Sequence, residues 1–127
     1  MKVRDAMRKD ADLALVPPDA KFLDVLNAIT KAGAGAACVV DSEGKLLGLV
    51  ADGDIRRRLL AEQEGALNDT AEELMTPNPA TIDADALAIE CLETFENHPK
   101  KIGELPVLDG GKVVGLVMLK DLIRLGL

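Results

Sequence analysis

The sequence predicts an α/β (α+β) fold built from two copies of one unit. The main observation is an internal repeat, since residues 45–60 read KLLGLVADGDIRRRLL and residues 112–127 read KVVGLVMLKDLIRLGL. Asp54 and Asp121 lie at the same place in the two copies, 67 residues apart. In both copies, apolar residues at helical spacing precede short apolar runs with turn residues between them. A repeat of this length indicates a duplicated structural unit, here ordered helix, strand, turn, strand, helix.

Local signals predict each element in turn. A helix over about 20–32 is predicted because Phe22, Val25 and Ile29 lie on one helical face, and Gly33 follows them. The first copy continues with a strand over 37–40, a turn at 41–44, a strand over 46–51 and a helix from Asp54. The second copy repeats this order with a helix over 84–97, a strand over 105–108, a Gly110-Gly111 turn, a strand over 112–118 and a helix over 120–126.

The repeat divides the chain into residues 1–66, the first copy with an N-terminal linker segment, and residues 67–127, the second copy. Halves of about 60 residues bury too little surface to be stable alone. We therefore predict a core shared by both copies. The polar stretch 63–70 is predicted to be the linker between them.

The composition argues against several classes of function. The chain has 15 Lys and Arg against 22 Asp and Glu, a formal net charge of -7, which disfavours nucleic-acid binding. Phe22 and Phe95 are the only aromatic residues, so a base-stacking platform is absent. No apolar run approaches the roughly 20 residues of a membrane-spanning helix, and no secretory signal is visible. We expect a soluble cytoplasmic protein that binds neither nucleic acid nor membrane.

The residues that usually carry catalysis or bind metals are scarce. Cys38 falls in an apolar strand and Cys91 on an apolar helix face, so both are expected to be core residues. His98 is the only histidine, which leaves too few ligands for a metal site. No nucleophile stands beside a base. We therefore assign no catalytic residue, no metal site and no required cofactor.

Over about residues 3–127 the chain resembles the CBS domain pair (cystathionine-beta-synthase domain, or Bateman module). The likeness rests on the glycine and the helix-starting aspartate of each copy and on two short motifs, namely Gly48 with Asp54, Gly115 with Asp121, Leu105-Pro106-Val107 and Met75-Thr76-Pro77. The resemblance implies that each copy is a small sheet with two helices on one face. It also implies a pseudo-two-fold relation between the copies and a flat homodimer.

Within that family, residues 51–57 (ADGDIRR) and 119–126 (LKDLIRLG) resemble the C-terminal regulatory pair of arabinose-5-phosphate isomerases. Sugar-phosphate nucleotidyltransferases with an amino-terminal pair carry a similar DGDIRR, so both subfamilies remain open. In an isomerase the catalytic domain would precede Met1. The chain is then either a regulatory fragment or a free-standing pair.

The resemblance also implies a nucleotide between the copies. Asp54 and Asp121 are assigned to the ribose hydroxyls, because a carboxylate accepts strong charge-assisted hydrogen bonds. The strand-to-helix turns would face the phosphate, and they contain Ala51, Asp52 and Gly53 in the first copy and Met118, Leu119 and Lys120 in the second. The base would be enclosed by Val16, Ala36 and Ala37 in the first cleft and by Ala80, Ile82, Leu105 and Pro106 in the second. Each of these apolar residues is also typical of a plain core.

Both turns depart from the family pattern. Ala51 and Met118 stand where the family has Ser or Thr, and losing a hydrogen bond to a charged group costs roughly 1.5–3 kcal/mol. Asp52 adds a negative charge near the first turn, which Arg57 and its two arginine neighbours would offset. Lys120 would serve the second turn. The alternative for the arginines is a solvated helix face.

Three hypotheses for function follow. The first is a non-catalytic module that senses AMP, ADP, ATP, or a cytidine or sugar nucleotide, and controls an attached or partner enzyme, a sugar-phosphate isomerase. The second is a ligand-free oligomerisation module, which the missing hydroxyls favour. The third, that the chain is itself an enzyme, is disfavoured because catalytic groups are absent.

Overall fold

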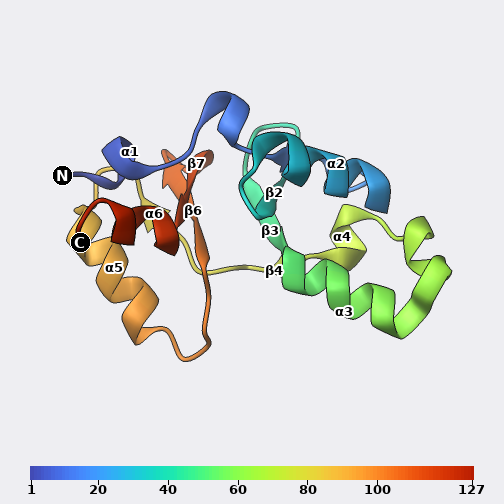
Figure 1. Cartoon of the computed structure of the whole chain (residues 1–127). Helices are drawn as coiled ribbons and strands as arrows, with labels where there is room; N and C mark the ends of the chain where they lie inside the picture. Colours follow the sequence, from blue (N-terminus) through green and yellow to red (C-terminus); the bar gives the residue numbers. More distant parts are fainter.

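The computed structural model describes residues 1–127 and contains two mixed sheets with helices packed on them (Figure 1). The first sheet has the order β1 (Leu15–Val16), β2 (Ala36–Val40), β3 (Leu46–Ala51) and β4 (Thr76–Pro77). The second has the order β5 (Ile82–Asp83), β6 (Glu104–Asp109) and β7 (Lys112–Met118). In both sheets a short parallel strand pairs with the first strand of an antiparallel hairpin. The predicted α/β fold is confirmed.

Four α-helices of six or more residues accompany the sheets, and all four were expected from the sequence. They are α2 (Phe22–Ala32), α3 (Asp52–Glu62), α5 (Ala88–Asn97) and α6 (Leu119–Arg124). Four short helical segments lie between them, namely α1 (Val3–Ala6), η1 (Asp10–Asp12), α4 (Ala71–Leu74) and η2 (Gln63–Asn68). The strands β3 and β7 have the predicted bounds, whereas the two-residue strands β1, β4 and β5 were not predicted.

Helix α3 begins at Asp52, two residues earlier than predicted. Ala51 is the last extended residue, and its backbone N–H donates to Asp54 Oδ2 at 2.9 Å. The carboxylate therefore satisfies an amide from inside the first turn of the helix rather than from the position before it.

The stretch 63–70, predicted to be a polar linker, is packed into the first unit instead. Ala66 is fully buried and Asp69 is almost so, and Phe22 N–H donates to the Asp69 carbonyl at 2.9 Å. The Asp69 carboxylate lies 3.6 Å from Arg58. The chain crosses to the second unit only after β4 (Figure 1). The packing of this stretch was not predicted, because a buried alanine and an ion-paired aspartate cannot be told from solvated residues by composition.

The two units exchange short segments of chain. The segment around α1 packs on the second unit, where Val3 is fully buried and Arg8 forms a β-bridge with Leu116. The segment of α4 and β4 packs on the first unit, where β4 pairs with β3. The exchange is reciprocal, as expected for a duplicated unit with pseudo-two-fold symmetry.

Within each exchanged segment, a methionine packs against a glycine in the hairpin of the opposite unit. A Cβ added to Gly48 would lie 2.4 Å from Met75 Sδ and 2.8 Å from the Thr76 carbonyl oxygen. At Gly115 the same distances, 2.4 and 2.8 Å, separate the added Cβ from Met7 Sδ and the carbonyl of the residue after it. Only glycine admits this backbone approach.

The buried side chains form two clusters rather than the single shared core that was predicted. The larger belongs to the first unit but includes Leu116 and Met118 from β7, and the smaller belongs to the second unit but includes Val3. Each sheet thus has its own buried cluster, and Leu116 and Met118 of the second sheet also contribute to the cluster of the first. The clusters are joined through the exchanged segments. Cys38 and Cys91 are buried free thiols in these clusters, and burial raises their pKa to about 12 and about 11.

Among the helices of this structure, none combines the length and apolar character needed to cross a membrane.

Gly48→Ala is expected to destabilise the protein by about 1–3 kcal/mol, because the new methyl group would overlap the Thr76 carbonyl as well as the Met75 side chain. Urea unfolding of the variant and wild type measures this. Gly103→Ala is the matched control, since nothing lies within 4 Å of an added Cβ there. Equal midpoints for the two variants would show that the glycine contact does not hold β4 in place.

A candidate nucleotide cleft at Asp54

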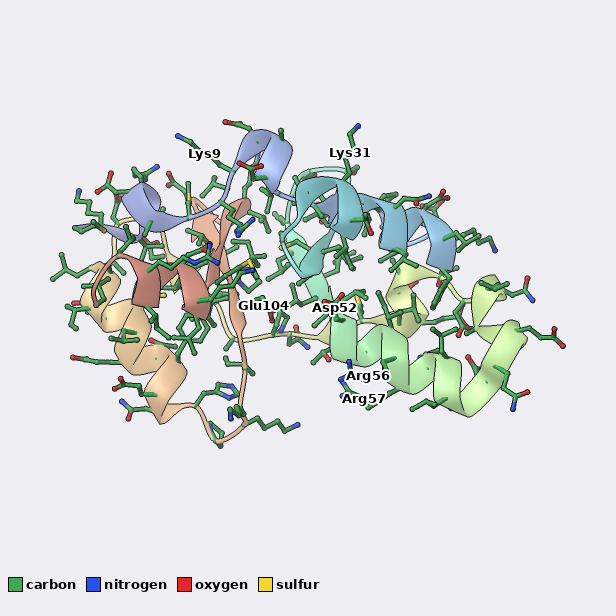
Figure 2. The ribbon with its side chains drawn as sticks, viewed as in Figure 1. Lys9, Lys31, Asp52, Arg56, Arg57 and Glu104 are labelled. Carbon is green, nitrogen blue, oxygen red and sulfur yellow. The ribbon has the colours of Figure 1, made fainter.

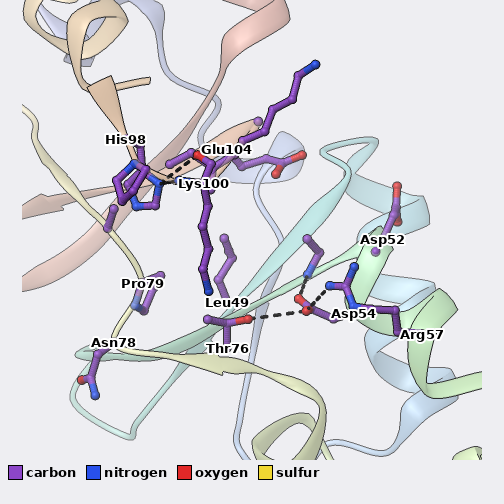
Figure 3. Close-up of a pocket in the computed structure, with 17 residues that line it drawn as sticks. Leu49, Asp52, Asp54, Arg57, Thr76, Asn78, Pro79, His98, Lys100 and Glu104 are labelled. Atoms are coloured by element: carbon purple, nitrogen blue, oxygen red, sulfur yellow. Dashed lines mark hydrogen bonds and ion pairs between the residues drawn. The ribbon is translucent and has the colours of Figure 1, made fainter. Parts of the chain in front are cut away.

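A cleft of about 810 Å³ opens between the two units beside Asp54 (Figure 3). Its walls come from three segments: the turn into α3, the chain that follows β4, and the loop between α5 and β6. Their lining residues are Leu49, Ala51, Asp52, Gly53, Asp54, Arg57, Thr76, Asn78, Pro79, Ala80, His98, Pro99, Lys100, Lys101, Ile102, Gly103 and Glu104. A volume of this size accommodates a nucleotide-sized molecule.

Asp54 is held at the cleft wall by three contacts. Oδ2 accepts the Ala51 N–H at 2.9 Å. Oδ1 lies 2.9 Å from Arg57 Nη2 and 3.5 Å from the Thr76 hydroxyl, which donates to it. Its side chain is 15% exposed, whereas that of Arg57 is 70% exposed. The carboxylate is therefore oriented by the protein, while its Arg57 partner is largely exposed to solvent.

Basic residues line the opposite side of the cleft. Lys100 and Lys101 lie in the loop between α5 and β6, both are exposed, and neither forms an ion pair. His98 fixes the turn, because its Nδ1 accepts the Lys100 N–H at 3.1 Å. Figure 3 shows His98 and Lys100 across the cleft from Asp54 and Arg57. Ammonium groups without carboxylate partners suit an anionic group such as phosphate.

Two further carboxylates, Asp52 and Glu104, face each other from the two units (Figure 2). Burial raises the pKa of Glu104, and the negative charges of Asp52 and Asp54 raise it further, while Lys120 opposes them. Carboxylates therefore lie on both walls of the cleft, Asp52 and Asp54 on the first unit and Glu104 at the end of the lysine-bearing loop on the second.

Asp121 has a different partner from Asp54. Arg8 Nε donates to Asp121 Oδ2 at 2.9 Å, and Nη2 lies 3.4 Å from Oδ1. Arg8 Nη1 donates to the Gly33 carbonyl at 3.1 Å. The pair is largely shielded, with side chains 22% and 19% exposed.

The structure gathers only some of the predicted site residues around the cleft. Those that line it are Ala51, Asp52, Gly53, Asp54, Arg57 and Ala80. Ala80 was grouped with the site of Asp121 and instead lines the cleft of Asp54. Asp121 and the turn before it, Met118, Leu119 and Lys120, lie outside this lining. Six further residues also lie outside it, five of them buried in or beside the cores: Val16, Ala36, Ala37, Leu105, Pro106 and the half-buried Ile82.

The site residues predicted from the sequence did not include Thr76 or the loop 98–104. Thr76 follows the methionine that packs on Gly48, and the residue at the same place in the other copy is Arg8. Aligning the two copies through these methionines would have paired Thr76 with Arg8, but it would not have shown that either lies beside a carboxylate. The loop has no counterpart of similar composition in the first copy, so the repeat gave no signal for it.

A family profile described as the CBS domain matches residues 3–61 and again 71–127, which together cover most of the chain. The chain belongs to the CBS domain family. The two matched ranges correspond to the two copies of the repeat, each including the segment that packs on the opposite unit, so the protein contains a tandem CBS pair.

The chain is similar to the C-terminal part of known isomerases. It is 38% identical over 122 residues to the arabinose 5-phosphate isomerase KpsF of Escherichia coli O6:H1, a match that covers 94% of this chain and 36% of that protein. It is 34% identical over 128 residues to the isomerase KdsD of Francisella tularensis, with 100% and 38% covered. The CBS pair thus spans little more than a third of the length of these relatives.

A solved structure shows the same fold in a complex. The CBS domain pair of protein MJ0100, with 5′-methylthioadenosine and S-adenosyl-L-methionine, superposes with a TM-score of 0.84 at 27% identity, covering 99% of this chain and 95% of that one. The fold of the pair is therefore compatible with ligands that contain adenosine in that protein.

Glu104→Gln is expected to stabilise the CBS pair increasingly as the pH rises above the ordinary glutamate value of about 4.5. The folded state binds the proton of the Glu104 carboxyl group more tightly than the unfolded state does. The wild-type side chain therefore contributes stability at low pH, and this contribution is lost as the carboxyl group ionises. Thermal melting of both proteins between about pH 4 and pH 8 measures the effect. Glu64→Gln, at an exposed glutamate of η2, is the control. A Tm difference for Glu104→Gln that is constant with pH would contradict the prediction.

Proposed function

We propose that the CBS pair is a non-catalytic regulatory module that binds an adenine nucleotide, or a related cytidine or sugar nucleotide, in the cleft at Asp54. The observation that carries this proposal is the pairing of an oriented carboxylate on one unit with two unpaired lysines on the other. A carboxylate accepts hydrogen bonds from a ribose diol, and ammonium groups bind phosphate. A nucleotide carries both groups.

The strongest objection to nucleotide binding is the missing hydroxyl in the turn before Asp54, and Thr76 brings a hydroxyl to the same carboxylate. Ala51 cannot supply the hydroxyl that the family pattern places in the turn before Asp54. Thr76 brings a hydroxyl to the same carboxylate from β4, at 3.5 Å from Oδ1. This hydroxyl lies in the cleft lining, so it is available to a ligand as well as to Asp54.

Ligand binding would act through the relative position of the two units. Asp54 belongs to the first unit and the loop 98–104 to the second, and a nucleotide that contacts both would favour the arrangement that places them at the right separation. A ligand shifts an equilibrium by the difference in its affinity for the two arrangements. The module would transmit that shift to an attached or partner enzyme.

The similarity to KpsF and KdsD supports a sugar-phosphate isomerase as that enzyme. A catalytic domain would then act on the sugar phosphate, and the CBS pair would adjust its activity. The isolated chain is expected to show no isomerase turnover. A cytoplasmic location is part of the same proposal.

Asp54→Asn is expected to raise the Kd for AMP by about 10- to 100-fold, which corresponds to losing roughly 1.5–3 kcal/mol from hydrogen bonds to a charged group. Asparagine keeps one oxygen to accept the Ala51 N–H, so the turn into α3 should remain. Isothermal titration with AMP, ATP and CMP measures the change. Asp24→Asn removes an exposed carboxylate from α2 and should leave binding unchanged. Equal affinities for both variants, or no binding by wild type, would refute the proposal.

A second role, self-association, is favoured by exposed aliphatic side chains on the second unit. Ile89, Ile123, Leu125 and Leu127 are 40–60% exposed on or after α5 and α6. A groove of about 350 Å³ runs between these helices. We propose a homodimer through this face, since two-fold dimers are the commonest assembly and buried aliphatic area stabilises them.

Ile123→Glu is expected to convert the dimer to a monomer, because it places a charge in the proposed contact. Sedimentation equilibrium at micromolar concentration measures the mass. Leu60→Glu, at a residue 78% exposed on α3, is the control and should leave the dimer intact. If the dimer forms and its affinity ignores every nucleotide, the ligand-free oligomerisation role replaces the sensing role.

A further inference from the structure

Asp54 and Asp121 stand at the same place in the two copies, so their surroundings can be compared directly. Arg8 and Thr76 each follow a methionine that packs on the glycine of the opposite hairpin. Arg8 lies beside Asp121 and Thr76 beside Asp54. The same place in the fold therefore holds a long cation in one unit and a small hydroxyl in the other.

The contacts of the two carboxylates differ accordingly. Asp54 uses one oxygen to accept the Ala51 N–H, and its other oxygen faces an exposed arginine and a hydroxyl. Asp121 has both oxygens engaged by the Arg8 guanidinium, at 2.9 and 3.4 Å. The third guanidinium nitrogen donates to Gly33. The guanidinium thus satisfies the carboxylate in the way that a pair of ribose hydroxyls would.

Met118 fills space on the same side. It stands where Ala51 stands in the first unit, and it is only 6% exposed, whereas Ala51 is half-buried in the cleft lining. Its Cε would lie 3.3 Å from a Cβ placed on Gly35. The side chain therefore reaches across to the first unit, and the alanine leaves the corresponding volume open.

We propose that Arg8 and Met118 close the cleft at Asp121 from within, so that the CBS pair binds one nucleotide per chain, at Asp54. For its ligand this inference rests on the proposed function. A nucleotide at Asp121 would have to displace a largely shielded ion pair, and separating such a pair leaves a carboxylate and a guanidinium without partners. Lys9 and Lys31 point outward from the molecule (Figure 2). Arg8 is the cation that bonds to Asp121.

Residue exchange between the two sites tests the proposal. Arg8→Thr with Met118→Ala gives the second site the residues of the first, and Thr76→Arg gives the first site the cation of the second. Isothermal titration with AMP should count one ligand per chain for wild type and two for the exchanged protein. Thr76→Arg should lose AMP binding. Circular dichroism checks that each variant is folded, and Arg8→Thr alone replaces the double variant if that one does not fold.

Two results would overturn the proposal. One is binding of two AMP molecules per chain by wild type. The other is a folded exchanged protein that still binds a single AMP, or a Thr76→Arg variant that binds AMP as wild type does.

A double-mutant cycle measured by thermal melting tests the closure without any ligand. Arg8→Met and Asp121→Asn should each lower Tm, and the double variant should lower it no further than the larger single change. The exposed pair of Arg4 with Asp109, at 2.9 Å in the same N-terminal segment, is the matched control and should show a smaller coupling. Additive changes at Arg8 and Asp121 would overturn the closure. Absence of AMP binding by wild type would refute the proposed function, and this cycle would then decide the inference alone.

Discussion

The packing of a methionine on a glycine, once in each unit, is the contact on which the rest of the structure depends. Met75 against Gly48 holds β4 on the first sheet, and Met7 against Gly115 holds the segment of α1 on the second. Each unit is thus completed by a short segment that belongs to the other copy of the repeat. This exchange joins the two buried clusters, which would otherwise be separate cores too small to be stable.

The same contact builds the cleft. Once Met75 is fixed, the chain that follows it passes Thr76 and Ala80 along the cleft wall before it enters the second unit. The loop 98–104 then faces the start of α3 from the other side. A protein with a net charge of -7 repels anions at long range, so the proposed binding of a phosphate would depend on this local placement of lysines. Asp52 and Asp54 line the first-unit wall of the cleft, whereas Lys100 and Lys101 lie with Glu104 on the second-unit wall.

The sequence could predict the local elements but not the contacts between distant segments. The hairpin strands β3 and β7 were predicted with their observed bounds, because apolar runs and turn residues are local signals. The exchange of α1 and α4 was not predicted, since nothing local says which sheet a short segment will join. Thr76 was noticed as part of a motif yet not as a site residue, because its role arises only when β4 lies beside Asp54. The prediction of one shared core was wrong for the same reason. It was inferred from the length of each half, and length does not show which surfaces pack together.

Exchange of segments also allows two copies of one unit to differ around their carboxylates. The residue after each packed methionine lies beside the carboxylate of the opposite unit, so a substitution there alters the contacts of one carboxylate. Arginine at residue 8 and threonine at residue 76 are such a pair. The N-terminal segment is then tied to both units, since Arg8 bonds to Asp121 in the second and to Gly33 in the first. Under the proposed function, a nucleotide at Asp54 would change the separation of the units that Arg8 bridges, and the segment of α1 would move with them.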